Sequence, residues 1–111
     1  SVTTITAKHY FQNGVHTFAG IIPMPTPCDL VDATTTVLNN GTPKKVSLDF
    51  TVIDNAQTCQ QTVTDQRFEV SVSGDDQTQF TARFMGRSVQ LNLIPAAPGE
   101  KPEDFQLYQK G

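Results

Sequence analysis

The chain alternates apolar and polar residues over several short runs, which is the spacing of side chains on the two faces of a β-strand. In residues 2–11, one face carries Ile5, Ala7, His9 and Phe11, while the other face is mostly polar. Such a run predicts a strand with one side against a core and the other side wetter.

The dipeptide Asn13-Gly14 after this run predicts a two-residue hairpin turn, because both central positions of that turn need a positive φ. A hairpin closed at this point keeps one set of side chains facing inward on both strands. It pairs Phe11 with His16, His9 with Phe18, Ala7 with Gly20, and Ile5 with Ile22.

Later runs predict further strands. Residues 46–52 alternate most cleanly, residues 30–38 are rich in β-branched side chains, and residues 68–72 repeat the pattern Phe-x-Val-x-Val. Met85-Gly86 predicts a second hairpin turn, since one register then satisfies both strands. That hairpin pairs Ala82 with Val89 and Phe80 with Leu91.

Composition and turn spacing both favour an all-β fold. Thr, Val and Ile together supply 30 residues, whereas Leu supplies six and Trp none. Seven or eight short strands predict an immunoglobulin-like two-sheet β-sandwich of antiparallel strands, with a small closed β-barrel as the alternative. We expect residues 1–111 to form this single domain, with residues 95–111 as a proline-rich, loosely ordered C-terminal tail.

Charge narrows the class of partner. The formal net charge is −3, the sequence pI is about 5.1, and the eight Lys and Arg residues are scattered. A protein partner therefore fits better than nucleic acid, which needs a basic patch. No apolar stretch reaches the roughly 20 residues of a transmembrane helix. The polar start Ser1-Val2-Thr3-Thr4 predicts that any export signal has already been removed.

Two cysteines, Cys28 and Cys59, stand at the edges of predicted strands. As a disulfide they would close a loop of about 30 residues and stabilise the fold by roughly 3.5 kcal/mol. The alternatives are two unpaired thiols in a cytosolic protein and a zinc site. Neither cysteine has a second Cys or His at ligand spacing, which disfavours zinc.

Few residues fall into patterns that carry catalysis. The chain has no Gly-x-Ser-x-Gly elbow, and no Ser or Cys has a His nearby in a recognisable local pattern. We therefore expect a protein that is not an enzyme and needs no cofactor. His9 and His16 would lie close together on the first hairpin and are candidate metal ligands if a carboxylate joined them. We expect packing beside Phe11 and Phe18 instead and no metal site, because two histidines without a clear third ligand are weak evidence for one.

Two loop motifs match known functional patterns, but each also has a simpler explanation. Gly74-Asp75-Asp76 is a source of oxygen ligands for calcium, but it lacks the spacing of an EF-hand and is typical of a plain turn. Asn40-Gly41-Thr42 matches the acceptor pattern for N-glycosylation, which matters only in a secreted eukaryotic protein.

The segment from Pro23 to Cys28 is the most informative one for function. Its three prolines, at alternate positions, preset an extended backbone that ends the preceding strand, and a disulfide at Cys28 would hold it rigid. A pre-ordered segment loses less conformational entropy on binding, which suits recognition of a protein partner. The structural alternative is a sheet-to-sheet crossover whose prolines block edge aggregation. The candidate contact residues are Pro23, Met24, Pro25, Thr26 and Pro27.

One pattern brings the two cysteines together: Pro25-Thr26-Pro27-Cys28, then Cys59-Gln60-Gln61-Thr62-Val63 and the strand from Phe68 to Val72. It resembles small bacterial extracytoplasmic or lipoprotein-type β-domains of uncharacterised function, over residues 15–93. The resemblance implies export and a bridge between Cys28 and Cys59, and it implies no activity. Chagasin-type inhibitors of cysteine proteases are also immunoglobulin-like, but this chain lacks their Gly-rich and Trp-containing loop motifs, which leaves an analogy of fold.

We therefore expect a non-enzymatic extracytoplasmic interaction module of unknown ligand, either secreted, periplasmic or on the cell surface. A lipid anchor outside this sequence is one way in which such a module is attached. The alternative function is a protein inhibitor of an extracellular protease, with the segment from Pro23 to Cys28 as its contact surface.

Overall fold

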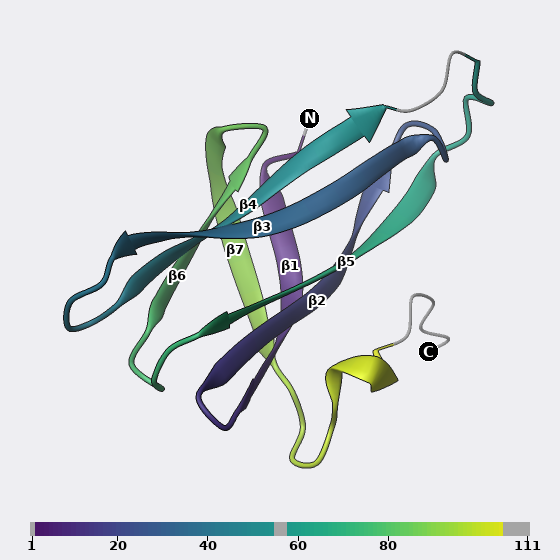
Figure 1. The fold of residues 1–111 in the computed structure, drawn as a ribbon. Helices are drawn as coiled ribbons and strands as arrows, with labels where there is room; N and C mark the ends of the chain where they lie inside the picture. Colours follow the sequence, from purple (N-terminus) through teal and green to yellow (C-terminus); the bar gives the residue numbers. More distant parts are fainter. Residues whose placement is uncertain (1, 55–57, 106–111) are drawn as a thin grey trace.

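Residues 2–54 and 58–105, which the computed structural model describes, form one mixed β-sheet of seven strands. The sheet curls until it is nearly closed into a barrel (Figure 1). Along the sheet the strands follow the order β3-β4-β6-β7-β1-β2-β5. The strands are β1 (Thr4–Gln12), β2 (Val15–Met24), β3 (Asp29–Asn39), β4 (Lys45–Asp54), β5 (Thr64–Ser73), β6 (Gln79–Phe84) and β7 (Arg87–Pro95).

The expected immunoglobulin-like sandwich of two antiparallel sheets is wrong, because β7 joins both parts of the sheet. The first residues of β7 pair with β6, and its residues from Gln90 to Pro95 pair with β1. The ladder between β7 and β1 is parallel, as is the ladder between β4 and β6. The sheet is therefore continuous from β3 to β5, and the small barrel, our alternative, is the closer description.

The hairpin of β1 and β2 has the predicted turn, and the cross-strand pairs next to this turn have the predicted register. Asn13 and Gly14 have φ values of 53° and 74°, as the two central residues of this turn type require. Two of the expected cross-strand pairs are confirmed, Phe11–His16 and His9–Phe18.

In both hairpins, the ladder between the two strands ends closer to the turn than the alternation of apolar and polar residues predicts. The ladder of β1 with β2 extends to Lys8–Ala19, so the expected pairs Ala7–Gly20 and Ile5–Ile22 lie beyond it. In the hairpin of β6 and β7, Ala82–Val89 is confirmed, but the ladder ends there, so the expected pair Phe80–Leu91 lies beyond it; Leu91 instead pairs with Ile5 of β1, on the other edge of β7. Strands in a strongly curled sheet twist and tilt, so a long strand passes from one neighbour to the next.

The inward-facing side chains of these strands share a single core. At its centre, Phe18 and Phe50 are 0% and 1% exposed. Burial of each large apolar side chain contributes about 1.5–3 kcal/mol, so this interior is the main source of stability. The other buried members are Ile5, Ala7, Ile22, Met24, Val46, Leu48, Phe68, Ala82 and Phe84.

Gly20 allows β1, β2 and β5 to approach closely. A Cβ atom at this position would lie 2.6 Å from the carbonyl oxygen of Thr6 and 2.7 Å from the ring of Phe68. The missing side chain leaves room for the Phe68 ring, which meets Phe50 edge to face with 4.7 Å between ring centroids. A larger residue at position 20 would displace Phe68 from the core.

The two edge strands, β3 and β5, meet at a seam of the barrel. Their Cα atoms come within 8 Å, although no β-ladder joins them in the described residues. The Cys28–Cys59 disulfide crosses the seam at the end where β3 and β5 begin, with 6.3 Å between the two Cα atoms. The Gln66 amide also donates to the carbonyl oxygen of Pro27, at 3.2 Å. The bridge is therefore confirmed, and it is consistent with an oxidising, extracytoplasmic location.

Asp49 connects edge strand β3 to β4 and β6. Its carboxylate accepts hydrogen bonds from Arg83 Nε at 2.7 Å and Nη2 at 3.0 Å, and from the Thr36 hydroxyl at 2.5 Å. The Arg83 guanidinium, helped by the Thr36 and Ser47 hydroxyls, lowers the pKa of Asp49 to about 2. Charge-assisted bonds of this kind fix the outer face of the three strands.

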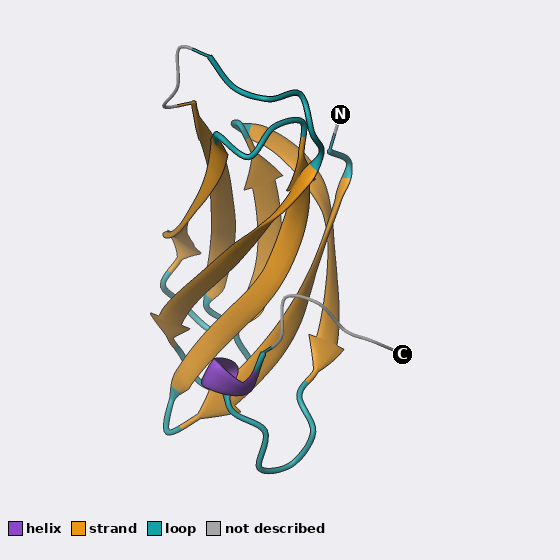
Figure 2. Ribbon diagram, turned by 90° about the vertical axis from the view of Figure 1, so that its right-hand side faces the viewer, coloured by secondary structure: helices purple, strands orange, loops and turns teal. Residues whose placement is uncertain are grey.

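After β7 the chain folds back against the outside of the barrel, where the short helix η1 (Pro102–Asp104) lies (Figure 2). Lys8 forms an ion pair with Glu100, and the Arg67 guanidinium lies 5.4 Å from the centroid of the Phe105 ring. With only three residues in η1, the described residues contain no helix able to cross a membrane. Residues 106–111, the rest of the predicted tail, lie outside the described residues.

The double substitution C28S/C59S is expected to lower the free energy of unfolding by roughly 3.5 kcal/mol, because the bridge restricts the unfolded chain. The two cysteines are 31 residues apart in the sequence. Urea unfolding followed by far-UV circular dichroism measures the change. The wild type in reducing agent is the matched control and should reproduce the double variant. An unchanged unfolding midpoint would contradict a stabilising role for the bridge.

Candidate functional site

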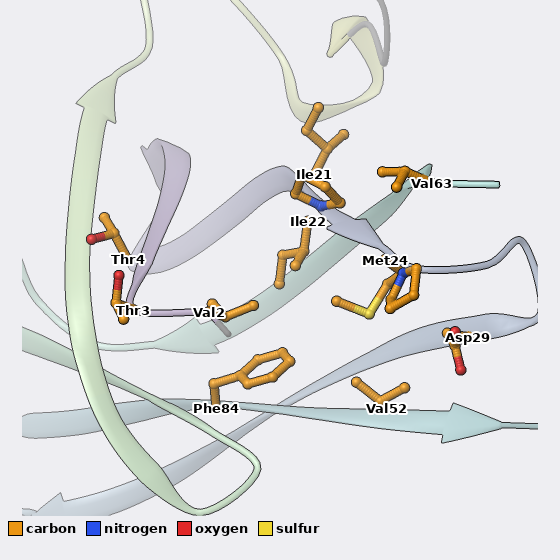
Figure 3. A pocket seen from close by; sticks show the side chains of 12 residues that line it. Val2, Thr3, Thr4, Ile21, Ile22, Met24, Asp29, Val52, Val63 and Phe84 are labelled. Atoms are coloured by element: carbon orange, nitrogen blue, oxygen red, sulfur yellow. The ribbon is translucent and has the colours of Figure 1, made fainter. Parts of the chain in front are cut away.

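An apolar groove of about 780 Å³ opens at the end of the barrel where β2, β4 and β6 end and β1, β3 and β5 begin. Figure 3 shows side chains from several of these strand ends directed into one space. Its apolar walls include Val2, Ile22, Met24, Val52, Val63 and Phe84.

The groove is a continuation of the core beyond the last filled layer of side chains. Ile22 and Met24 are alternate residues on the inner face of β2, and they are 3% and 4% exposed. On β4, Val52 continues the inward stripe of Phe50 but is only half-buried. Residues 2–4 form the wall on the β1 side, so the barrel is hollowed at this end.

The segment from Pro23 to Cys28 forms one wall of the groove, with a geometry that differs from the expected extended linker. β2 continues through Pro23 to Met24, and residues 25–28 turn. The Thr26 hydroxyl holds the turn by donating to Asp29 Oδ2 at 2.8 Å and accepting from the Cys28 N–H at 3.2 Å. Met24 and Thr26 are buried, whereas the prolines are exposed. The segment therefore presents prolines to solvent and Met24 to the groove.

Val63 marks the mouth of the groove. It lies directly before β5 and is 71% exposed, more than the other exposed large apolar residues. Apolar surface that stays open to water at the rim of a concave site is typical of ligand-binding surfaces. The groove is thus open to a ligand from the side where β5 begins.

Asp29 is the charged residue of the groove wall. It is the first residue of β3 and is half-buried. Among the described residues that line the groove, none is Lys, Arg or His. The electrostatic character of the site is therefore set by one carboxylate in an apolar surface.

His9 and His16 lie at the hairpin end of β1 and β2, away from the groove, and stack with phenylalanine rings. The ring centroids of His9 and Phe18 are 4.8 Å apart, and those of Phe11 and His16 are 4.2 Å apart. His16 is 2% exposed. His16 is thus part of the packed interior, and His9 lies half-buried at its margin.

The two imidazoles form a hydrogen-bonded chain that ends on the backbone. His16 Nε2 lies 2.7 Å from the carbonyl oxygen of Asp75, which can only accept, so His16 Nε2 carries the proton. His16 Nδ1 then accepts from His9 Nε2 at 2.8 Å. Burial lowers the pKa of His9, and the nearby His16 adds to this effect. This chain ties the turn at Asp75 to the hairpin.

A shared metal ion at this pair would need a third ligand. Within residues 2–54 and 58–105, no three His, Cys, Asp or Glu side chains are grouped so as to hold a metal ion. The carboxylate of Asp75 accepts from the Gln77 N–H at 3.0 Å, as in a plain turn. The metal hypothesis for His9 and His16 stays a prediction, and their contacts are those of packed side chains.

A second hollow, of about 700 Å³, lies between the β1–β2 hairpin and residues 95–102. Tyr10 lines it, and in the described residues its buried hydroxyl has no hydrogen-bond partner. Burial raises the pKa of Tyr10, because the phenolate would be poorly solvated there. The ion pair of Lys8 with Glu100 holds the C-terminal segment over this region. We assign this hollow to the docking of that segment.

The sequence identified part of the groove. Three of the expected contact residues, Pro23, Met24 and Pro25, line it, whereas the walls from β4, β6 and the N-terminal residues were not predicted. Alternation marks Val52 and Phe84 as inward-facing, but only the topology brings their strand ends together. Comparison with known proteins gives no match to a family model, a curated protein or a solved structure. The interpretation of the groove therefore depends on its geometry.

Lowering the pH from about 7 to 5 is expected to reduce the free energy of unfolding through His9. The unfolded histidine binds a proton near pH 6.5, whereas the folded His9 has a lowered pKa. The contribution of His9 to the free energy of unfolding is therefore fully present above the pKa of the unfolded histidine. It is lost as the pH falls toward the lower pKa of the folded His9. Urea midpoints measured across this range, with NMR titration of the imidazole protons, test the expectation.

The substitution His9→Gln is the matched variant, because its amide can still donate to His16 Nδ1 and cannot titrate. Its urea midpoint should depend less on pH than that of the wild type. An equally steep dependence in the variant, or a folded His9 that titrates above pH 6.5, would contradict the assignment.

Proposed function

We propose that this chain is a non-enzymatic, extracytoplasmic binding module that holds an extended apolar segment of a protein partner in the groove. The observation that carries the proposal is the open apolar hollow of about 780 Å³. This volume falls within the roughly 300–1,000 Å³ that is usual for ligand sites. Covering the groove with an apolar segment removes Val63 and its neighbours from water, which favours binding.

The sheet edges favour a polypeptide as the ligand. In the described residues, β3 pairs only with β4 and β5 only with β2, so no ladder covers the two edges that face each other across the seam, although the Asp29 N–H already donates to the Thr26 carbonyl oxygen. Asp29 is the first residue of β3 and Val63 directly precedes β5, and both line the groove. An extended peptide can use the apolar wall and these backbone groups together, whereas a purely apolar small molecule uses only the wall.

The lining chemistry supports binding rather than catalysis. Its polar side chains are the hydroxyls of Thr3 and Thr4 and the carboxylate of Asp29. Hydroxyl nucleophiles need an adjacent base that removes their proton, and no imidazole stands among the described lining residues. The proposal includes a secreted, periplasmic or cell-surface location, in line with the disulfide.

Inhibition of an extracellular protease through Pro23–Cys28 is the alternative proposal. A rigid inhibitory segment inserts its side chains into the cleft of the enzyme. Here Met24 and Thr26 are 4% and 8% exposed, so the residues between the prolines are turned into the domain. The groove therefore has the stronger support.

Titration of the ¹⁵N-labelled domain with capped octapeptides that alternate valine or isoleucine with threonine tests the proposal. We expect chemical-shift changes concentrated at Ile22, Met24 and Val63. The substitution Val63→Asp should weaken binding about tenfold, which corresponds to the loss of one buried valine contact.

Val37→Asp is the matched control, because Val37 is a 47% exposed valine near the other end of β3. It should bind the peptides as the wild type does. The proposal fails if no peptide moves the resonances of the groove, or if both substitutions weaken binding equally.

A further inference from the structure

We infer that the segment held in the groove carries a positive charge beside Asp29, so that the partner presents a basic as well as an apolar sequence. The inference rests on the proposed function and adds the chemistry of the ligand. It follows from the apolar groove together with the sign and position of the charge in its wall.

The carboxylate of Asp29 has capacity for a further partner. From side chains in the described part of the chain it accepts one hydrogen bond, from Thr26 Oγ1 at 2.8 Å. The ion pairs of the described residues do not include Asp29. A carboxylate has about four lone-pair sites, so a bound ammonium or guanidinium group can be accommodated beside the Thr26 hydroxyl.

Strand alternation turns Asp29 toward the groove. On β3, Asp29 and Val31 are half-buried, whereas Leu30 and Asp32 are exposed on the other face. In the register of β3 with β4, Asp29 also lies opposite Asp54.

The order of the strands fixes where the positive charge belongs along the ligand. The strand order β3-β4-β6 places Asp29, Val52 and Phe84 in a staggered row along one wall of the groove (Figure 3). Because Asp29 is the charged residue of the lining, a basic side chain of the ligand is favoured on the β3 side of the groove, next to residues that cover Val52.

The experiment compares three capped octapeptides of the alternating series, identical except for a lysine, a glutamine or a glutamate at one end. Their dissociation constants are measured by isothermal titration calorimetry on the wild type, Asp29→Asn and Asp32→Asn. Asn at position 29 keeps an oxygen that accepts from Thr26 and removes the charge. Asp32 is the control because it lies on the same strand and faces outward.

We expect the lysine peptide to bind the wild type about fivefold more tightly than the glutamine peptide, as suits a partly exposed charge pair. The glutamate peptide should bind most weakly. Asp29→Asn should abolish these differences and Asp32→Asn should retain them. In about 0.5 M salt the preference should shrink, because exposed charges are screened.

Equal binding of the lysine and glutamine peptides to the wild type would overturn the inference while leaving the groove as a peptide site. A preference that survives in Asp29→Asn, or that Asp32→Asn removes equally, would also overturn it. If none of the three peptides binds, the proposed function fails together with the inference. Amide NMR spectra of both variants verify that the fold is retained.

Discussion

The burial of one stripe of apolar side chains around Phe18 and Phe50 sets the register of the strands. Because side chains alternate in direction, a slip of one residue in any ladder would turn that strand's apolar set toward water. The inner faces of β1, β2, β4 and β6 can meet only if the sheet curls, and the curl brings the edges of β3 and β5 together. The groove is the part of this interior that the strand ends leave unfilled.

Pairings between neighbours in sequence could be predicted, and pairings between distant strands could not. Asn13 and Gly14 have positive φ, as do Met85 and Gly86, so the two turns have a local chemical signature. The parallel ladder that joins Thr6 to Asn92 has no such signature. The sandwich prediction relied on the number of strands and on turn spacing, which a sandwich and a curled single sheet share.

The segment from Pro23 to Cys28, which forms part of the groove wall, was identifiable from the sequence, but the direction of its side chains was not. Alternating prolines indicated a rigid backbone from Pro23 onward, and the rigidity comes partly from the Thr26 turn and the disulfide. Burial of Met24 depends on β5, β4 and β6 reaching the same end of the barrel, which no local pattern contains. For the same reason no local pattern in the sequence singles out Asp29. Its place in the groove wall follows from its register opposite Asp54.

Because β7 pairs with two different strands along its length, the two halves of the sheet cannot separate without disrupting the whole domain. Its residues up to Val89 belong to the ladder with β6, and those from Gln90 onward belong to the ladder with β1. Separating the half that contains β3, β4 and β6 from the half that contains β1, β2 and β5 requires rupture of β7 hydrogen bonds and exposure of the shared core. Partial opening therefore removes most of the stabilising burial at once, which favours an all-or-none transition over stepwise detachment of individual strands.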